Sequence, residues 1–229
     1  MSTIASNLQV VRARIAAAAL AAGRASSGIT VLAVSKTFSA VEVRTAYAAG
    51  QSEFGENYLQ EALEKMNALA DLPLVWHFIG ALQSNKTRII AEHFDWVHTV
   101  ARANIAQRLA QARPAGRAPL DVCLQVNLGA EPSKSGVTPE GLRPLAEAVR
   151  ALPQLRLRGL MAIPEPGGDF ALQRRRFASL RLLLEQLNDA GFGLDTLSMG
   201  MSQDLEAAVM EGATIVRIGT AIFGERKKS

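Results

Sequence analysis

The stretch ITVLAVSKTFSAVEVRTAYAAG, residues 29–50, contains the pattern that decides the fold. Its first part, Ile29 to Val34, is an apolar run rich in valine and isoleucine, which is typical of a strand buried on both faces. The second part predicts a helix, because Ser39 is a suitable N-cap, Glu42 stands in the capping-box position and Gly50 is a stop signal. A strand followed by a helix is the repeating unit of an α/β fold.

The same alternation continues along the chain. About eight βα units match the (β/α)8 TIM barrel in number and order. A doubly wound open sheet is the alternative, but no G-x-G-x-x-G fingerprint follows the first strand. Further strands are predicted at 53–56, 74–79, 96–100, 122–126, 155–163, 196–199 and 214–218, and helices at 39–49, 59–69, 85–93, 102–112, 139–151, 170–190 and 203–211.

The N-terminal residues predict an extra helix ahead of the barrel. Ile4, Leu8, Val11 and Ile15 recur at helical spacing with polar residues between them, which indicates an amphipathic helix rather than a signal peptide. No run approaches the roughly 18 apolar residues of a membrane span. We therefore expect one α/β barrel domain over residues 1–229, of which 1–25 are the leading helix, in a soluble cytoplasmic protein.

Composition and charge exclude several classes of protein. Hydrophobic residues make up 48% of the chain and charged residues 20%, which is ordinary for a globular protein and excludes intrinsic disorder. The net charge of +4 is spread thinly, apart from clusters at 174–176 and in the tail at 226–228, so we expect neither nucleic acid nor a membrane as partner. The lone Cys123 allows no internal disulfide and indicates a small buried hydrophobe.

Lys36 is the first candidate functional residue. In such a barrel the active face lies at the carboxyl ends of the strands, and Lys36 directly follows the first one. Burial lowers the pKa of an ammonium group, and a neutral amine can form a Schiff base with an aldehyde. Pairing with Glu56, or extension of the side chain into solvent, would explain the lysine equally well.

Two further segments indicate an anion site. Gly200, Met201 and Ser202 precede the helix predicted at 203–211, where backbone N–H groups and a hydroxyl could hold an anion. Gly219 and Thr220 follow the last strand, and phosphate sites in these barrels often form after strands seven and eight. The simpler interpretation of Ser202 is that it only caps its helix.

Arg217 is the third feature, because it interrupts an apolar strand. A buried guanidinium is costly without a partner, so either a salt bridge to a neighbouring strand or a ligand acceptor inside the barrel is expected. An amine, an anion site and a buried arginine at one barrel mouth together suggest an aldehyde that carries a phosphate. Pyridoxal 5′-phosphate (PLP) is such a molecule.

Seven stretches extend this interpretation to nearly the whole chain. In order, they resemble the pyridoxal phosphate homeostasis protein family, of the YggS and PROSC type. The stretches are LAVSKT (32–37), FGENYLQEA (54–62), WHFIGALQSNK (76–86), SKSGV (133–137), RGLMAI (158–163), LSMGMSQDLEAA (197–208) and VRIGTAIFG (216–224).

The resemblance implies a barrel similar to the N-terminal domain of alanine racemase, the type III fold of PLP-binding proteins. It also implies a role in intracellular PLP, or vitamin B6, homeostasis. The implied contacts are a Schiff base of PLP on Lys36, which would make it an N6-pyridoxal phosphate lysine, the ring nitrogen facing Arg217, the phosphate held by Ser202, Gly219 and Thr220, and the ring lined by Asn57 and Met199.

We expect a cofactor holder without robust catalysis, and therefore no catalytic residue and no metal. An arginine opposite the ring nitrogen keeps that nitrogen unprotonated and weakens the ring as an electron sink. Racemases with this arrangement add a tyrosine from a second domain, whereas this chain ends about ten residues after its last predicted strand. Apo-enzymes that depend on PLP are expected recipients, and the chain is expected to be a monomer or weak dimer.

Two enzymatic alternatives stay open. A PLP-dependent amino-acid racemase would need Tyr58 or His77 as its second acid or base. A Schiff-base aldolase acting on a sugar phosphate would need no cofactor. That second alternative is disfavoured because no other lysine is predicted at a strand end, Lys65 being placed in a helix.

Overall fold

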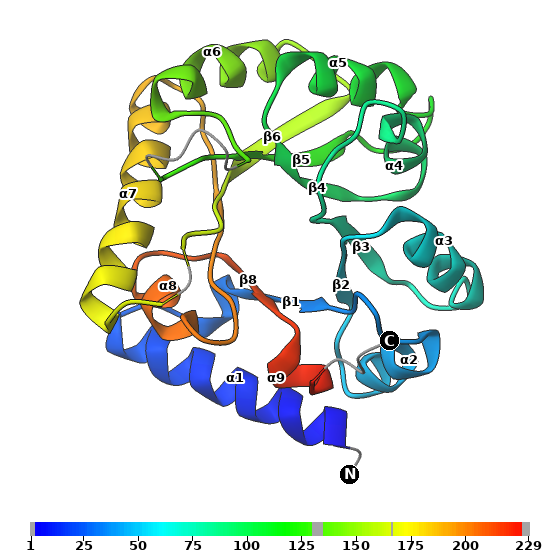
Figure 1. The fold of residues 1–229 in the computed structure, drawn as a ribbon, viewed down its shortest axis with the longest axis vertical. Coiled ribbons are helices and arrows are strands. Elements are labelled where there is room, and N and C mark those ends of the chain that lie inside the picture. The colour runs from blue at the N-terminus through cyan, green and yellow to red at the C-terminus, as the bar shows by residue number, and fades with distance from the viewer. Residues whose placement is uncertain (1–2, 130–134, 166, 226–229) are drawn as a thin grey trace.

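The runs that the sequence predicts as strands pair into one closed sheet. In the computed structural model, which describes residues 3–129, 135–165 and 167–225, neighbouring strands are parallel and follow chain order, and β8 pairs with β1. This confirms the (β/α)8 barrel (Figure 1). The strands are β1 (Thr30–Val34), β2 (Glu53–Glu56), β3 (Val75–Phe78), β4 (Trp96–Val100), β5 (Leu120–Gln125), β6 (Leu155–Met161), β7 (Thr196–Ser198) and β8 (Ile215–Ile218).

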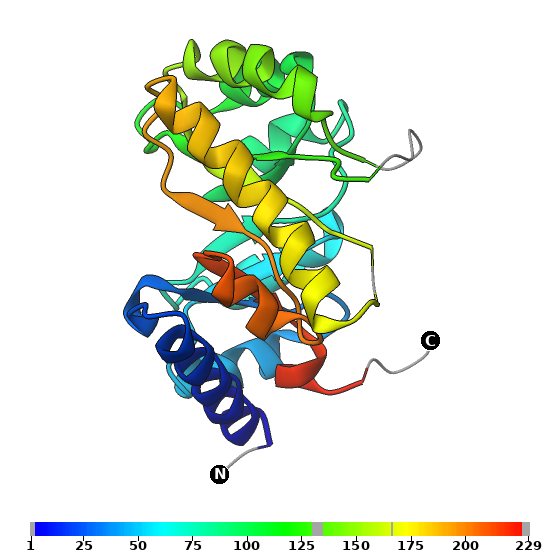
Figure 2. The ribbon, with the colours of Figure 1, turned by 90° about the vertical axis from the view of Figure 1, so that its left-hand side faces the viewer.

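The helices form the outer layer around the strands, and Figure 2 shows α7 running along the outside of the barrel. Two short elements were not predicted, the 3-10 turn η1 (Ser26–Gly28) and α9, because neither is long enough to show a hydrophobic period. The α-helices are α1 (Thr3–Ala21), α2 (Ala40–Ala48), α3 (Leu59–Ala68), α4 (Thr87–His93), α5 (Ala103–Ala112), α6 (Pro139–Arg150), α7 (Phe170–Asp189), α8 (Leu205–Met210) and α9 (Thr220–Phe223).

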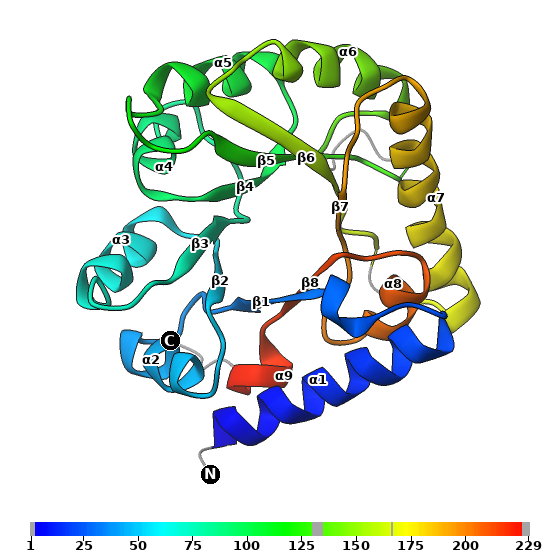
Figure 3. The same ribbon diagram turned by 180° about the vertical axis from the view of Figure 1, so that it is seen from behind.

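The leading helix α1 packs along α8, α9 and α2 (Figure 3). Leu8, Val11 and Ile15 are buried, so the amphipathic pattern read from the sequence identifies the face that packs. The helix ends at Ala21 rather than at the expected residue 25. Gly23 follows with a φ of 65°, a left-handed conformation that terminates helices.

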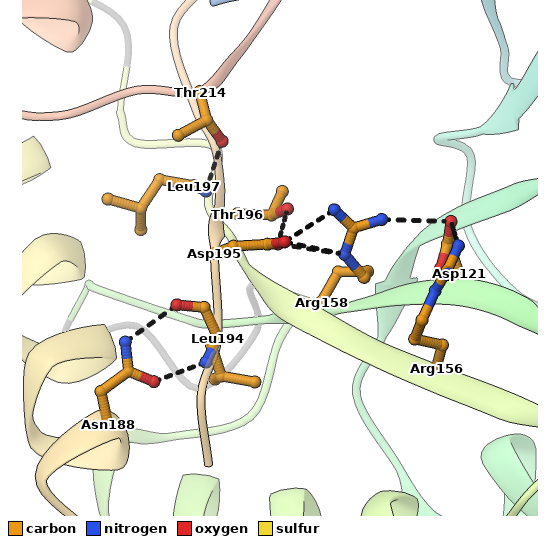
Figure 4. A network of polar contacts seen from close by, with 9 residues as sticks. All are labelled: Asp121, Arg156, Arg158, Asn188, Leu194, Asp195, Thr196, Leu197 and Thr214. Carbon is orange, nitrogen blue, oxygen red and sulfur yellow. Dashed lines mark hydrogen bonds and ion pairs between the residues drawn. The ribbon is translucent and has the colours of Figure 1, made fainter. Parts of the chain in front are cut away.

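The strand β5 begins at Leu120, two residues before its predicted start at 122, and therefore includes Asp121. A carboxylate is costly inside a sheet unless it has a partner. Two arginines of β6 compensate the charge: Arg156 Nη2 donates to Asp121 Oδ2 at 2.6 Å, and Arg158 lies 3.3 Å from the same carboxylate (Figure 4).

The same network extends to β7 (Figure 4). Arg158 Nη2 donates to Asp195 Oδ2 at 2.7 Å, and Thr196 donates to Asp195 Oδ1 at 2.7 Å. Partial burial raises the pKa of Asp195, but these hydrogen bonds and the arginine charge outweigh it and leave that pKa lowered. Asn188 exchanges two hydrogen bonds with the backbone of Leu194, which ties the end of α7 to the start of β7.

Several sequence-based expectations concern residues outside this network. Cys123 is buried, and burial raises the pKa of its thiol. The basic tail at 226–228, and residues 133–134 of the SKSGV stretch, lie outside the described residues. Within the described ranges, no helix is long and apolar enough to cross a membrane, and no cluster of three potential metal ligands occurs.

The close contact between β6 and β7 generates a prediction about stability. A Cβ added to Gly159 would lie 1.8 Å from the backbone oxygen of Thr196, so Gly159→Ala forces two paired strands apart. Overpacking of this kind costs roughly 1–3 kcal/mol or more. We expect a matching loss in the free energy of unfolding, measured by urea denaturation.

The matched control is Gly28→Ala, because a Cβ at Gly28 meets no atom within 4 Å. That variant should stay within about 0.5 kcal/mol of the parent. Equal stability of the two variants would contradict the tight β6–β7 contact.

Candidate functional site

A cavity of about 320 Å³ opens where the carboxyl ends of β1, β2, β7 and β8 meet. This volume lies in the range of small-molecule sites. The structure brings six of the seven predicted site residues together in its lining: Lys36, Asn57, Ser202, Arg217, Gly219 and Thr220.

The seventh predicted residue, Met199, does not line the cavity. Its side chain is fully buried in the core, while Met201 takes a place in the lining. The reason is the alternation of side chains along a strand. Ser198 points into the barrel, where Arg217 contacts it, so the next residue points outward toward the helices.

Lys36 is half-buried at the end of β1, and both of its chain neighbours are tightly held. Before it, the Ser35 hydroxyl donates to Glu56 Oε1 at 2.6 Å. After it, the Thr37 N–H donates to Glu61 Oε1 at 2.5 Å. Thr37 has a φ of 69°, a left-handed conformation that is uncommon outside glycine. The backbone that presents Lys36 is therefore fixed from both sides.

Lys65 joins these two anchors into one buried cluster. Its Nζ donates to the Ser35 carbonyl oxygen at 2.6 Å, to Glu56 Oε1 at 2.7 Å and to Glu61 Oε1 at 2.5 Å. Burial raises the pKa of Glu56, and the Lys65 charge opposes that rise. The cluster consists of residues 35, 56, 61 and 65, and it contacts the backbone on both sides of the candidate nucleophile Lys36.

This cluster corrects the expectation that only Lys36 reaches a strand end. Lys65 does lie in a helix, α3, as the sequence predicts, but its side chain spans from that helix to the end of β1. It also replaces Lys36 as the partner of Glu56. The spacing of Glu61 and Lys65, four residues apart on one helix face, was a sequence signal for the pair. Only the tertiary structure reveals that the pair is buried.

Arg217 is buried inside the barrel, and all of its acceptors among the described residues are neutral. Its Nη1 donates to Ser198 O at 2.6 Å and to Ser198 Oγ at 2.9 Å, and its Nη2 donates to Ala162 O at 2.9 Å. Burial lowers the pKa of Arg217 to about 10, so the guanidinium stays charged at neutral pH. A salt bridge to a neighbouring strand, one of the two explanations expected from the sequence, is absent from the described residues.

The hydroxyl groups of Ser202 and Thr220 lie next to each other in the cavity lining. Thr220 Oγ1 lies 3.3 Å from Ser202 Oγ, and the Ala221 N–H donates to the same oxygen at 3.4 Å. From outside the barrel, Arg14 of α1 donates to the Ser202 carbonyl at 3.1 Å and pairs with Glu206 at 2.7 Å. The leading helix therefore anchors this loop.

The segment before α8 differs from the prediction. The helix begins at Leu205 rather than at Gln203, and the Met201 N–H expected to be free donates to Asp204 Oδ1 at 2.6 Å. Asp204 also lines the cavity, and burial raises the pKa of its carboxyl group. Sequence reasoning missed this residue, because the predicted helix at 203–211 included Asp204 as an ordinary helical residue.

Asn57 lies where the loops after β2 and β3 touch. A Cβ at Gly80 would lie 2.2 Å from the Asn57 carbonyl oxygen, so the close approach depends on glycine. The Asn57 Oδ1 atom is buried without a hydrogen-bond partner among the described residues. It is a polar group that a ligand in the cavity could satisfy.

The set of groups around the cavity defines its chemistry. A lysine supplies a nucleophilic amine, a buried guanidinium supplies N–H donors, and two hydroxyls with a glycine backbone face them. This donor set suits a flat polar molecule with an aldehyde at one end and an anionic group at the other.

The sequence and fold match known proteins over nearly the full chain. Residues 2–227 match the family model described as alanine racemase, N-terminal domain. The pyridoxal phosphate homeostasis protein of Pseudomonas aeruginosa is 66% identical, with 99% of this chain and 97% of that protein covered. The chain therefore belongs to the alanine racemase N-terminal domain family and, within it, to the pyridoxal phosphate homeostasis proteins.

Solved structures agree with this assignment. PipY of Synechococcus elongatus, determined with PLP bound, superimposes with a TM-score of 0.85 at 41% identity, covering 96% of this chain and 100% of PipY. Alanine racemase of Corynebacterium glutamicum gives a TM-score of 0.73 at 16% identity, covering 100% of this chain and 62% of the racemase. The second likeness concerns the fold alone.

The buried cluster generates a prediction about Lys65. Lys65→Met leaves two carboxylates beneath Lys36 without their cation, and breaking a buried pair costs about 3–5 kcal/mol. We expect a loss of this size in the free energy of unfolding at pH 7.

Lys86→Met is the matched control, because that ammonium makes no ion pair within the described chain, and it should change stability by about 0.5 kcal/mol or less. Adding Glu56→Gln to Lys65→Met should restore part of the loss, since it removes one stranded charge. A Lys65→Met protein as stable as the Lys86→Met control would show that the cluster contributes little.

Proposed function

We propose that the chain binds pyridoxal 5′-phosphate in this cavity and serves intracellular PLP homeostasis. The observation that carries the proposal is the convergence of Lys36, Arg217 and the Ser202–Thr220 pair around one cavity. The names of its relatives, and the PLP bound to PipY, support the same ligand.

The residues that line the cavity fit PLP. The Lys36 amine would attack the aldehyde carbon, forming a carbon–nitrogen double bond while the aldehyde oxygen leaves as water. Arg217 would donate to the ring nitrogen, since the guanidinium can only donate. Ser202, Gly219 and Thr220 would hold the phosphate, and Asn57 would contact the ring. Met201, rather than Met199, would line the ring, a proposal supported by the presence of Met201 in the cavity lining.

The proposed role is to hold and deliver PLP, with PLP-dependent apo-enzymes as recipients, rather than to turn over a substrate. What supports this is the lining itself: its described residues include no tyrosine, histidine or cysteine, and its one carboxyl group, that of Asp204, accepts the Met201 N–H at 2.6 Å. Tyr58 is 56% exposed and outside the lining, and His77 is buried against His98.

The binding experiment uses borohydride reduction of the PLP-loaded protein. Reduction should bleach the visible absorbance and leave one added pyridoxyl phosphate group, which peptide mapping should place on Lys36. Lys36→Ala should lose both signals, and Lys86→Ala should keep them. Unchanged absorbance in Lys36→Ala, or a modification on another lysine, would refute the assignment.

A separate measurement tests whether the PLP-loaded protein acts on amino acids. In deuterated water, the PLP-loaded protein should exchange the Cα hydrogen of amino acids no faster than free PLP does, because the described lining has no tyrosine, histidine or cysteine and its Asp204 carboxyl is bonded to the Met201 N–H. Rapid exchange with any member of a broad amino-acid panel, lost in Lys36→Ala, would instead establish a racemase-like enzyme.

A further inference from the structure

The interior of the barrel holds a row of polar side chains that leads away from the cavity. Such interiors are ordinarily filled by branched apolar residues. Here Arg217 of β8, Ser198 of β7, His98 of β4 and His77 of β3 lie inside, and none is more than 4% exposed. The first of them lines the cavity, and the function proposed above leaves the other three without a role.

These side chains contact one another in sequence. Arg217 Nη1 donates to Ser198 Oγ at 2.9 Å, and Ser198 Oγ lies 2.7 Å from His98 Nδ1. His98 Nε2 lies 2.9 Å from His77 Nδ1. At the far end, Glu53 Oε2 lies 3.0 Å from His77 Nε2, at ion-pair distance although not aligned as a hydrogen bond. Glu53 is partly exposed and begins β2.

The chemistry of the two ends fixes the direction of the hydrogens. Arginine can only donate, and a carboxylate can only accept. Ser198 Oγ therefore accepts from Arg217, and its own hydrogen goes to His98 Nδ1. His98 must then carry its hydrogen on Nε2 and donate to His77 Nδ1. The reverse direction would leave the Ser198 hydrogen without an acceptor in the row.

This direction requires both imidazoles to be neutral. Burial lowers the pKa of His98 well below its ordinary value, which favours the neutral imidazole. His77 also stacks on Trp96, with ring centroids 5.4 Å apart. His98 is therefore a neutral hydrogen-bonding group, and the stacking contact holds the His77 ring in place beside it.

The row leaves Arg217 with a defined set of donors. Of the five N–H groups of an arginine, three bond Ser198 O, Ser198 Oγ and Ala162 O. The remaining two have no acceptor in the described part of the chain, and the guanidinium lines the cavity. Because His98 Nδ1 takes the serine hydrogen, the hydroxyl is turned so that an oxygen lone pair faces Arg217, and the imidazole thereby helps to fix the orientation of the guanidinium.

We propose that His98, supported by His77, is a positioning residue that holds Arg217 through Ser198 and makes the cavity selective for a ring with an unprotonated nitrogen. The inference rests on the proposed function, since the ring is that of PLP. A donor held in this orientation favours a ring that presents a lone pair and does not favour a C–H group at the same place.

The experiment compares two ligands, PLP and its 1-deaza analogue, in which a C–H group replaces the ring nitrogen. Dissociation constants are measured by absorbance titration for the parent chain, His98→Leu, Ser198→Ala and the exposed control His93→Leu. The parent should bind PLP roughly tenfold or more tightly than the analogue. In His98→Leu and Ser198→Ala this ratio should fall several-fold through weaker PLP binding alone, while His93→Leu keeps it.

Each outcome decides a different point. A parent chain that binds both ligands equally, or a His98→Leu chain that keeps the full ratio, overturns the positioning role while PLP binding stands. An equal loss for both ligands also overturns it, because the histidine would then only support the fold. If His98→Leu does not fold, Ser198→Ala makes the same test. A parent chain that binds neither ligand refutes the proposed function itself, and the inference with it.

Discussion

The burial of a permanently charged guanidinium inside the barrel constrains the strands and side chains that surround it. Arg217 cannot lose its charge by an ordinary pKa shift, so the surrounding strands must supply acceptors. The acceptors are the backbone and hydroxyl oxygens of Ser198 and the backbone oxygen of Ala162. These hydrogen bonds join the carboxyl ends of β6, β7 and β8 around one cation. Two of the five guanidinium donors have no acceptor among the described residues, and Arg217 lines the cavity. A row of polar side chains extends from it into an interior that is usually apolar.

A second buried cation is handled in the opposite way. Lys65 is neutralised by Glu56 and Glu61, and the same cluster holds the residues on both sides of Lys36. The difference fits the roles of the two cations. The Lys65 ammonium donates to two carboxylates and a backbone carbonyl, so it supports the backbone next to Lys36. Arg217 has two N–H donors without an acceptor among the described residues, so it can contact a ligand. The Lys65 cluster holds the backbone on both sides of the Lys36 amine, and Arg217 itself lines the cavity.

Most of the fold could be predicted because its signals are local. Each strand and each long helix has its own apolar pattern, and the order of the elements limits the topology. The site residues Lys36 and Arg217 could be found for the same reason, because each is a charge beside or within an apolar strand. Lys65 and Asp204 could not, since their side chains act across to other segments. Met199 was misplaced because one step along a strand reverses the side-chain direction.

The sequence by itself determined the (β/α)8 alternation, the family and the strand ends that carry the candidate amine and hydroxyls. Those features depend on residues near one another in the chain. Only the tertiary structure decided which partner each buried charge has: Glu56 with Lys65 rather than with Lys36, and Arg217 with carbonyls and with the Ser198–His98–His77 row. Burial makes such partners obligatory, but their identity depends on closing the barrel, which brings β3, β4, β7 and β8 together around one interior.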